Sequence, residues 1–293
     1  MTTVTEVEGR RLKLSNLDKV LWPAPGYTKG EALHYYTRIA GALLPYLHDR
    51  PASFLRFPEG VEGQRFFAKN VPPGAPDWVA TAEIEGKSST VRHVLVQDLP
   101  TLLWAVNLAA IEIHVPQWRV TEPELSDRIV FDLDPGPPAT VVECCQAALL
   151  LREALAEDGL DAWPKTSGSK GLHLYVPIEG APSADTSAYA KALAVRLEER
   201  HPELVLHRMT KSLRRGRVFV DWSQNNRAKT TVAPYVVRAK EQPTVSAPLG
   251  WDEVEACSAP QELAFLPDEV VERVEEYGDL MAPVLEERFR LPG

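Results

Sequence analysis

Long apolar segments are the first thing that this sequence lacks. No run of about 18 apolar residues occurs in the chain, which excludes a membrane-spanning helix. The N-terminal stretch from Met1 to Arg11 is polar and of mixed charge, so we do not expect it to be a secretory signal peptide. We therefore expect no membrane association, and the cytoplasm is the default location.

Cysteine is also scarce. The three cysteines, Cys144, Cys145 and Cys257, fit a reducing compartment and do not have the spacing of metal ligands. Cys144 and Cys145 fall within a helical pattern and are expected to pack in the core. Internal repeats, low-complexity tracts and a dividing linker are absent as well, which favours one compact unit with lobes.

Positive charge is in deficit over the chain as a whole. There are 32 Lys and Arg against 41 Asp and Glu, a net charge of −9, which argues mildly against nucleic-acid binding by the entire surface. The charge is uneven, however, because residues 251–293 are strongly acidic and residues 207–217 are basic. Since salt screens charges beyond about 8–10 Å, a local basic face can still bind phosphates.

What the sequence does contain is the composition of a globular protein. With 293 residues, 44% of them hydrophobic, the chain can bury a substantial core as one large domain or two small ones. Helix and strand patterns alternate along it. This order predicts an α/β or α+β fold with helices outside the sheets.

Capping boxes mark the start of two helices. Thr28 to Glu31 opens a helix with apolar residues at helical spacing as far as Leu47, and Thr140 to Glu143 opens one that should end near Gly159. Further helices are expected over 102–110 and 187–200, with short ones in the tail from residue 251. Strands are expected over 111–120, 128–134, 172–178, 217–222 and 230–238, with short strands in 51–76 and a hairpin in 83–97.

The sequence from Phe131 to Gly136, Phe-Asp-Leu-Asp-Pro-Gly, is the most informative motif. Side chains alternate along a strand, so Asp132 and Asp134 share one face, about 7 Å apart, with Leu133 on the other. Two such carboxylates repel each other unless a cation lies between them, and hard divalent cations prefer oxygen ligands. One interpretation is a metal site for phosphoryl or nucleotidyl transfer. The other is a turn capped by two solvated aspartates.

A second motif, Thr-Ser-Gly-Ser-Lys-Gly-Leu-His, runs from Thr166 to His173. Its glycines and serines let the backbone approach a ligand, and Lys170 offers a charge for phosphate. The spacing is not that of a Walker phosphate loop. A plain connector with a solvated lysine therefore explains the motif as well.

Asp221 ends an apolar strand, where it either completes a cage of three carboxylates with Asp132 and Asp134 or caps a turn. Downstream of it, Lys229 and Arg238 are candidates for phosphate contacts.

Two candidates lie before the aspartate motif. His114 is on a predicted strand beside Glu112, and a lone strand histidine is either a catalyst or a hydrogen-bonded structural residue. Phe66 and Phe67 precede Lys69. Such a group either stacks on a base beside a phosphate or packs in the core.

Three motifs taken together resemble a known family. Asp-Leu-Asp-Pro-Gly at 132–136, Ser-Gly-Ser-Lys-Gly-Leu-His-Leu-Tyr at 167–175 and Val-Phe-Val-Asp-Trp-Ser-Gln-Asn at 218–225 closely resemble, in this order, the polymerase domain of bacterial ligase D, which belongs to the archaeo-eukaryotic primase superfamily. The resemblance extends through 14–23, 114–118, 209–214 and 230–238 and covers nearly the whole chain.

The resemblance implies one primase-superfamily polymerase domain over 1–293, with central, mostly antiparallel sheets and flanking helices. Within it we expect an N-terminal lobe of about 1–110 that binds the DNA 5′-phosphate. A catalytic core of about 111–245 and an acidic helical tail of about 251–293 would follow.

Functional roles follow from the resemblance position by position. The catalytic, metal-binding carboxylates are Asp132, Asp134 and Asp221. The nucleotide-binding residues are His114, Ser167, Lys170, His173, Gln224 and Arg238. The DNA-binding residues are Lys19 and Lys29 at the 5′-phosphate of the downstream strand, Phe66 and Phe67 at the template, Arg214 near the 3′ end, and Lys69 and Lys211.

The implied function is template-directed polymerisation that fills gaps or extends ends in bacterial non-homologous end joining. The implied cofactors are two divalent ions, Mn²⁺ or Mg²⁺, with NTP or dNTP as substrate and ribonucleotides favoured. The implied partners are double-stranded DNA ends, gapped DNA with a 5′-phosphate, Ku and an ATP-dependent DNA ligase. Such a protein would be associated with the nucleoid in the bacterial cytoplasm.

Two features depart from the family pattern or limit its reach. Leu55 precedes Arg56-Phe57-Pro58, where some members carry a lysine, so recognition of the 5′-phosphate is expected to be weaker or differently arranged. No Lys-x-Asp-Gly ligase motif occurs. We therefore expect either a stand-alone polymerase that recruits a separate ligase or an excised domain.

Other functions stay open on the sequence alone. A primase-polymerase would start chains without a primer, and an end-bridging module would bind broken DNA with weak or lost catalysis. The intact carboxylates, Lys170 and His173 argue against lost catalysis. A metal-dependent nuclease is less favoured, because the 166–173 loop suits a triphosphate better than a scissile diester.

Overall fold

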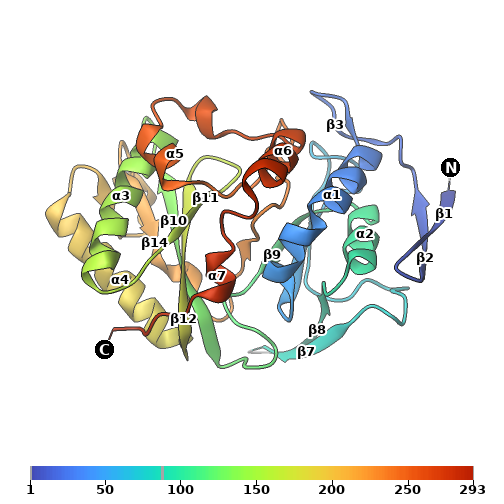
Figure 1. The fold of residues 1–293 in the computed structure, drawn as a ribbon, viewed down its shortest axis with the longest axis horizontal. Coiled ribbons are helices and arrows are strands. Elements are labelled where there is room, and N and C mark those ends of the chain that lie inside the picture. The colour runs from blue at the N-terminus through green and yellow to red at the C-terminus, as the bar shows by residue number, and fades with distance from the viewer. Residues whose placement is uncertain (1, 87–88, 293) are drawn as a thin grey trace. The chain divides into compact units, whose positions relative to one another are not determined.

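The computed structural model describes residues 2–86 and 89–292. The chain forms two compact units (Figure 1). The first contains the chain up to Pro116, Thr230–Val245 and Leu266–Gly278, and the second contains Gln117–Lys229, Ser246–Phe265 and the chain from Asp279. Each unit combines a mainly antiparallel sheet with helices, which confirms the predicted mixed α/β fold with flanking helices.

The second unit is built on a five-stranded sheet in the order β11-β12-β10-β14-β13. Its strands are β10 (Leu125–Pro135), β11 (Trp163–Thr166), β12 (Leu172–Pro182), β13 (Val205–Leu206) and β14 (Val218–Asp221). Neighbouring strands run antiparallel except β13 and β14, which run parallel. Because β10 is central, the aspartate motif at its end has a strand on either side.

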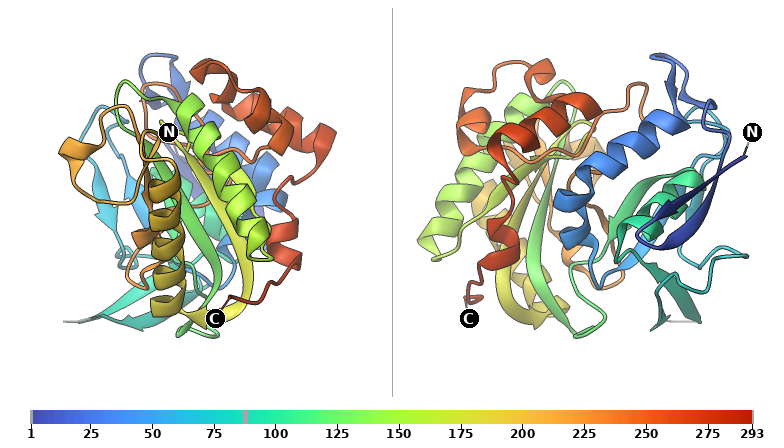
Figure 2. Two further views of the ribbon diagram at one scale, coloured as in Figure 1. Left: turned by 90° about the vertical axis from the view of Figure 1, so that its left-hand side faces the viewer. Right: turned by 45° about the vertical axis from the view of Figure 1, so that its right-hand side comes forward.

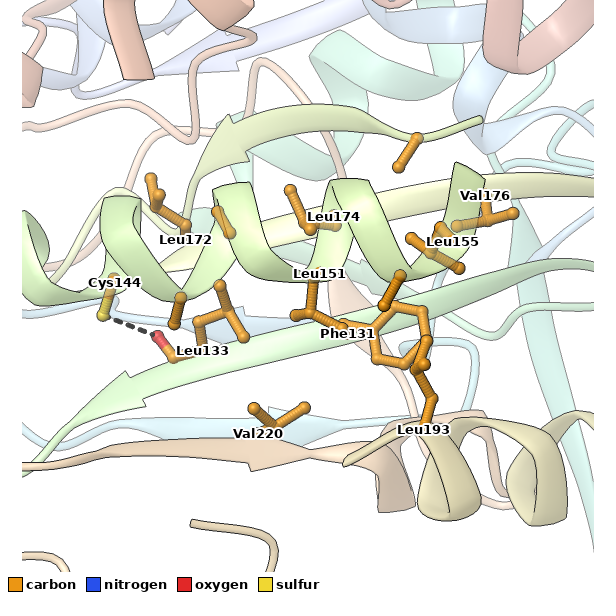
Figure 3. Close-up of a cluster of buried hydrophobic side chains, with 14 of the residues drawn as sticks. Phe131, Leu133, Cys144, Leu151, Leu155, Leu172, Leu174, Val176, Leu193 and Val220 are labelled. Atoms are coloured by element: carbon orange, nitrogen blue, oxygen red, sulfur yellow. Dashed lines mark hydrogen bonds between the residues drawn. The ribbon is translucent and has the colours of Figure 1, made fainter. Parts of the chain in front are cut away.

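Because side chains alternate along each strand, one face of this sheet packs in the core and the other does not. Leu133 of β10, Leu174 of β12 and Val220 of β14 are fully buried in a core shared with α3 (Val141–Glu157) and α4 (Ser183–Arg200). Figure 3 shows these side chains gathered between the strands and the helices. The alternate positions, which include the motif aspartates, therefore face away from α3 and α4.

The helix α3 matches its prediction at both ends. Thr140 and Glu143 form the capping box, and Gly159 adopts a φ of +74° just beyond the helix. Cys144 and Cys145 are both buried, as predicted.

The first unit contains a six-stranded sheet in the order β15-β9-β5-β8-β7, with β6 paired to β5. Its strands are β5 (Pro51–Arg56), β6 (Phe66–Ala68), β7 (Thr81–Glu85), β8 (Thr90–Leu95), β9 (Ala110–Val115) and β15 (Thr231–Val232). All pairs are antiparallel. The helices α1 (Lys29–Leu47) and α2 (Leu99–Asn107) pack against each other (Figure 2), and α1 begins at the predicted capping box of Thr28 and Glu31.

Several element bounds differ from the predictions. The helix predicted over 102–110 starts at Leu99, because Asp98 caps it. The helix predicted over 187–200 starts at Ser183, since its first turn is polar and lacks the apolar periodicity used for prediction. The strand predicted over 111–120 ends at Val115, before a proline. The strand predicted over 230–238 covers only β15, because Pro234 and the positive φ of Tyr235 interrupt it.

The remaining elements are short. They are β1 (Thr2–Val7), β2 (Arg10–Ser15), β3 (Val20–Trp22), β4 (Tyr27–Thr28), α5 (Trp251–Ala256), α6 (Pro267–Tyr277), α7 (Pro283–Glu286) and the 3₁₀ helices η1 (Lys211–Leu213), η2 (Trp222–Asn225) and η3 (Pro260–Leu263). The acidic tail thus forms short helices, as predicted. In the part of the chain that the structure describes, no helix has the length and apolar character needed to cross a membrane.

Candidate active site

Aspartates from neighbouring strands come together at the centre of the second unit's sheet. Asp132 on β10 is the register partner of Asp221 on β14. Leu133 is fully buried, whereas the side chains of Asp132 and Asp134 are 17% and 51% exposed, so the predicted alternation is confirmed. Asp221 is buried and caps η2 by accepting the Ser223 N–H at 3.0 Å.

Polar side chains hold Asp132 and Asp221 in place. The Gln224 amide nitrogen donates to Asp221 Oδ2 at 2.9 Å and to Asp132 Oδ2 at 3.3 Å. His173 Nε2 lies 3.2 Å from Asp132 Oδ1, and the Ser223 hydroxyl donates to Asp221 Oδ1 at 2.5 Å. Two predicted nucleotide-binding residues, His173 and Gln224, thus contact the predicted metal-binding carboxylates.

Two cationic side chains lie near Asp134 and Asp221. Arg214 Nη1 is 3.8 Å from Asp134 Oδ2, and Lys229 Nζ is 3.9 Å from Asp221 Oδ2. Partial burial and then repulsion by Asp132 raise the pKa of Asp134 to about 7, with Asp221 adding to the shift and Arg214 opposing it. The cluster therefore has a deficit of positive charge that a bound cation would relieve.

The chemistry of the cluster suits a hard divalent cation, because carboxylate oxygens are the ligands that Mg²⁺ and Mn²⁺ prefer. Across residues 2–86 and 89–292, no group of three or more His, Cys, Asp or Glu side chains is already arranged to hold a metal ion. Instead, the Gln224 amide bridges Asp132 and Asp221, and Asp134 lies near Arg214. The aspartates thus fit a divalent ion in donor type and charge, and enclosing one requires their side chains to rearrange.

The loop after β11 is tied together by its own serine. Ser167 Oγ accepts the N–H of Ser169 at 3.2 Å and the N–H of Gly171 at 3.1 Å. Two backbone N–H groups of the loop are therefore used within the loop itself. The Lys170 side chain is exposed and carries the charge of this loop.

Two motif glycines permit close backbone approaches. A Cβ at Gly171 would lie 1.9 Å from the carbonyl oxygen of Leu133, between the two motif aspartates. A Cβ at Gly136 would lie 1.8 Å from the carbonyl oxygen of Arg214. Gly171 thus packs the loop directly onto β10, and Gly136 admits the basic segment beside Asp134.

The basic segment 207–217 is anchored through Arg214. Its guanidinium lies 3.9 Å from the ring centroid of Phe219 and donates to the Met209 carbonyl at 3.1 Å. Lys211 begins η1 and is exposed. The segment therefore combines one fixed and one exposed cation of the predicted DNA-binding set.

In the first unit, Glu112 joins His114 to Arg238. Glu112 Oε2 is 2.8 Å from His114 Nε2, and Oε1 is 3.1 Å from Arg238 Nε. Burial alone would raise the pKa of Glu112, but the hydrogen bond from His114 and the charge of Arg238 outweigh it and lower the pKa to about 2. The two predicted nucleotide-binding residues of this unit therefore share one ionised carboxylate.

The two lysines predicted at the DNA 5′-phosphate are adjacent but differ in exposure. Lys19 forms an ion pair with Glu59 at 2.9 Å. Lys29 donates to the carbonyl and the Oδ1 of Asn107 at 3.1 and 3.0 Å, and it is only 4% exposed. Burial, together with the nearby charge of Lys19, lowers the pKa of Lys29.

Phe66 and Phe67 are 45% and 56% exposed on β6, and Lys69 Nζ lies 5.7 Å from the ring centroid of Phe67. These rings do not pack in the core, so the core interpretation of the pair is wrong. They form an exposed aromatic surface next to a cation.

Sequence reasoning missed two residues that organise these groups. Asn225 anchors η2 to β10, since its amide donates to the Val130 carbonyl at 2.9 Å and accepts the Val130 N–H at 2.8 Å. Nothing local in the sequence signals this long-range contact. The second is Glu112, for which the Glu-x-His spacing on a predicted strand was an available signal.

A mainly antiparallel sheet that presents aspartates on one face, beside a lysine-bearing loop and a basic segment, is typical of enzymes that transfer phosphoryl or nucleotidyl groups. Comparison with known proteins narrows the class. A family model described as "LigD, primase-polymerase domain" matches residues 28–281. The chain therefore belongs to the LigD primase-polymerase domain family, which consists of nucleotidyltransferases.

Individual relatives support the same family. "Multifunctional non-homologous end joining protein LigD" of Mycolicibacterium smegmatis is 46% identical over 278 residues, 94% of this chain and 36% of the relative. "Bifunctional non-homologous end joining protein LigD" of Bacillus subtilis is 32% identical over 270 residues, 92% of this chain and 43% of the relative. The chain thus spans less than half the length of these curated relatives.

A solved structure, "Polymerase Domain from Mycobacterium tuberculosis Ligase D in complex with DNA", matches with a TM-score of 0.90 and 41% identity. The match covers 95% of this chain and 99% of that one. The fold described above is therefore that of a LigD polymerase domain, as the sequence resemblance implied.

Proposed function

We propose that this chain adds nucleotides, under the direction of a template, to DNA ends and gaps during bacterial non-homologous end joining. The observation that carries the proposal is the cluster of Asp132, Asp134 and Asp221, whose deficit of positive charge a divalent cation would relieve. The names of the relatives, which refer to end joining, and the DNA in the solved complex support the repair role.

Asp132, Asp134 and Asp221 would hold two divalent ions, Mn²⁺ or Mg²⁺. Such ions lower the pKa of a primer 3′-hydroxyl and stabilise a leaving pyrophosphate. The chain's own contribution is orientation: Gln224 and His173 hold Asp132, and Gln224 also holds Asp221.

The incoming NTP or dNTP would be bound by residues that supply positive charge and hydrogen-bond donors, with ribonucleotides preferred. The proposed set is His114, Ser167, Lys170, His173, Gln224 and Arg238. The exposed Lys170 and the Arg238 guanidinium would offset charge that builds on the phosphates in the transition state.

DNA would be bound by cations and exposed aromatic rings. The proposed residues are Lys19 and Lys29 for the 5′-phosphate, Phe66 and Phe67 for the template, Arg214 for the 3′ end, and Lys69 and Lys211. The exposure of both phenylalanines favours stacking on a base. Because Lys29 is buried beside Lys19, it would add charge from beneath the surface on which Lys19 lies.

We propose that the enzyme acts with Ku and an ATP-dependent DNA ligase, in the nucleoid region of the bacterial cytoplasm. The functional division proposed from the sequence is a 5′-phosphate-binding lobe of about 1–110, a catalytic core of about 111–245 and a helical tail of about 251–293.

Extension of a labelled primer across a short gap tests the function. The downstream strand carries a 5′-phosphate, and Mn²⁺ or Mg²⁺ is supplied with ribo- or deoxynucleotides. We expect metal-dependent, templated addition with ribonucleotides used at least as well. DNA binding without addition under any of these conditions would favour an end-bridging module, and product on a single-stranded template without primer would favour a primase.

A further inference from the structure

Glu112 is a buried carboxylate that joins two side chains proposed to bind the nucleotide. It lies on β9 and is 5% exposed. One of its oxygens contacts His114 Nε2 at 2.8 Å and the other contacts Arg238 Nε at 3.1 Å. Both oxygens are thus engaged by nitrogen groups of these two side chains.

The backbone around Arg238 is fixed by other contacts. The Arg238 N–H donates to the Thr244 carbonyl at 2.7 Å, and its carbonyl accepts from Trp22 Nε1 at 3.3 Å. The next residue, Ala239, donates its N–H to Glu112 Oε1 at 3.0 Å. With the backbone held in this way, the ion pair with Glu112 helps to orient the guanidinium.

Tyr36 joins the same two segments through backbone groups. Its hydroxyl donates to the Ile111 carbonyl at 2.8 Å and accepts the Val237 N–H at 3.1 Å. Ile111 directly precedes Glu112 in the sequence, and Val237 directly precedes Arg238. Tyr36 therefore holds the two segments together through their backbones, whereas Glu112 contacts their side chains. Variants of the two residues can separate these two roles.

We propose that Glu112 is a positioning residue for nucleotide binding, which holds His114 and Arg238 in the orientation in which they bind the phosphates of the incoming nucleotide. The inference rests on the proposed function and adds to it a residue that touches no substrate.

The protonation states agree with this role. With its pKa lowered to about 2, the Glu112 carboxylate is ionised at neutral pH and only accepts hydrogen bonds. His114 Nε2 therefore carries the proton, which fixes the orientation of the ring. Glu112 supplies one negative charge, whereas Arg238 and a protonated His114 together carry two positive charges. When His114 is protonated, one positive charge therefore remains to attract a phosphate.

Glu112→Gln tests the inference. A glutamine has no negative charge and only one acceptor oxygen, so it cannot both form the ion pair with Arg238 and keep the carboxylate's contact with His114. Calorimetry of ATP with Mg²⁺, in the absence of DNA, measures triphosphate binding directly, and single-nucleotide addition gives KM and kcat. We expect the affinity to fall by about tenfold or more and KM to rise by a similar factor, as loss of a charge-assisted hydrogen bond implies. We expect kcat and the affinity for gapped DNA to change by less than about threefold.

Two variants separate positioning from stability. Tyr36→Phe removes the hydroxyl bonds between the same segments, so it should lower Tm while the triphosphate affinity stays within about threefold of wild type. Glu112→Asp keeps the charge on a shorter side chain, so its affinity should lie between those of wild type and Glu112→Gln. This smaller loss relative to wild type tests the inference if Glu112→Gln does not fold.

The outcomes distinguish the inference from the function on which it rests. Wild-type triphosphate affinity in Glu112→Gln would overturn the inference, and so would an equal loss of affinity in Tyr36→Phe. An equal loss of DNA binding in Glu112→Gln would also overturn it, because the role would then be structural. A wild-type protein that binds no triphosphate and adds no nucleotide would overturn the proposed function, and the inference with it.

Discussion

The aspartate cluster of the second unit and the Glu112 group of the first unit combine carboxylates with cations in opposite balance. In the aspartate cluster, three carboxylates have His173 at 3.2 Å from Asp132, an Arg nitrogen at 3.8 Å from Asp134 and a Lys nitrogen at 3.9 Å from Asp221. In the Glu112 group, a single carboxylate has nitrogen partners at 2.8 and 3.1 Å.

The pKa values reflect this balance. Burial and the neighbouring aspartates raise the pKa of Asp134 to about 7. The pKa of Glu112 is lowered to about 2 even though burial opposes the change, because His114 and Arg238 stabilise its charge. The comparison teaches that neighbouring carboxylates with too little positive charge repel one another, which a bound cation would relieve, whereas a carboxylate paired with cations keeps its charge without one.

Removing a carboxylate from the aspartate cluster should have the largest effect on nucleotide addition. We expect Asp132→Ala to slow nucleotide addition by about a thousandfold or more, because roughly 4 kcal/mol of metal-ion stabilisation of the transition state is lost. Single-nucleotide addition to a gapped duplex measures the effect. Asp127→Asn is the matched control, since Asp127 lies on the same strand and pairs with Arg119 at 2.9 Å. Substantial addition by a folded Asp132→Ala protein would contradict the metal assignment.

Removing the satisfied carboxylate should instead cost stability. Glu112→Ala breaks a buried ion pair with Arg238, and we expect the free energy of unfolding to fall by about 3 kcal/mol. A carboxyl whose folded pKa is about 2, below its ordinary 4.5, stabilises the fold above about pH 4.5 and loses this effect as the pH falls towards 2. Denaturant unfolding should therefore show the stability gap between wild type and Glu112→Ala shrinking over that range. A gap independent of pH would argue against the ion pair.

A smaller effect is expected for Lys19, which we propose contributes to DNA binding from the first unit. We expect Lys19→Ala to weaken binding of a gapped duplex by about three- to tenfold when the downstream strand carries a 5′-phosphate, because one charged contact is lost. Binding to the same duplex with a 5′-hydroxyl should not change. The exposed Lys13 on β2 provides the control variant Lys13→Ala. Equal losses with and without the phosphate would count against the role of Lys19.

The smallest effect concerns the metal-free protein. The pKa of Asp134 in the folded protein is raised from 3.8 to about 7, so its protonated form favours the fold. This stabilisation is lost as the pH rises through that interval. Asp134→Asn should therefore stabilise the protein at pH 8 and change little at pH 4. Its side chain is 51% exposed, so solvent screening limits the gain to about 1 kcal/mol. Thermal unfolding in the presence of a chelator measures it, and an equal shift at both pH values would contradict the repulsion.

The features that could be predicted from the sequence are those that depend on residues close together in the chain. The capping boxes at Thr28 and Thr140 located the starts of α1 and α3, because a cap depends on residues within one turn. The alternation of Asp132, Leu133 and Asp134 followed from the period of a strand.

Contacts between distant residues could not be predicted in this way. Gln224 reaches Asp132 across a sequence separation of 92, and Lys29 is buried against Asn107 across a separation of 78. Such contacts depend on how strands and helices pack, which no local pattern encodes. The roles of site residues came from the family resemblance, while their partners came only from the structure.

Binding of Mn²⁺ to the metal-free protein, followed by electron paramagnetic resonance at neutral pH, tests the central claim most directly. We expect wild type and Glu112→Gln to bind Mn²⁺ with similar affinity, because Glu112 is already satisfied by its neighbours. We expect Asp132→Ala to bind it at least about tenfold more weakly, since it has lost a carboxylate ligand. Equal Mn²⁺ affinity in Asp132→Ala and wild type would contradict the claim that the aspartate cluster is the metal site.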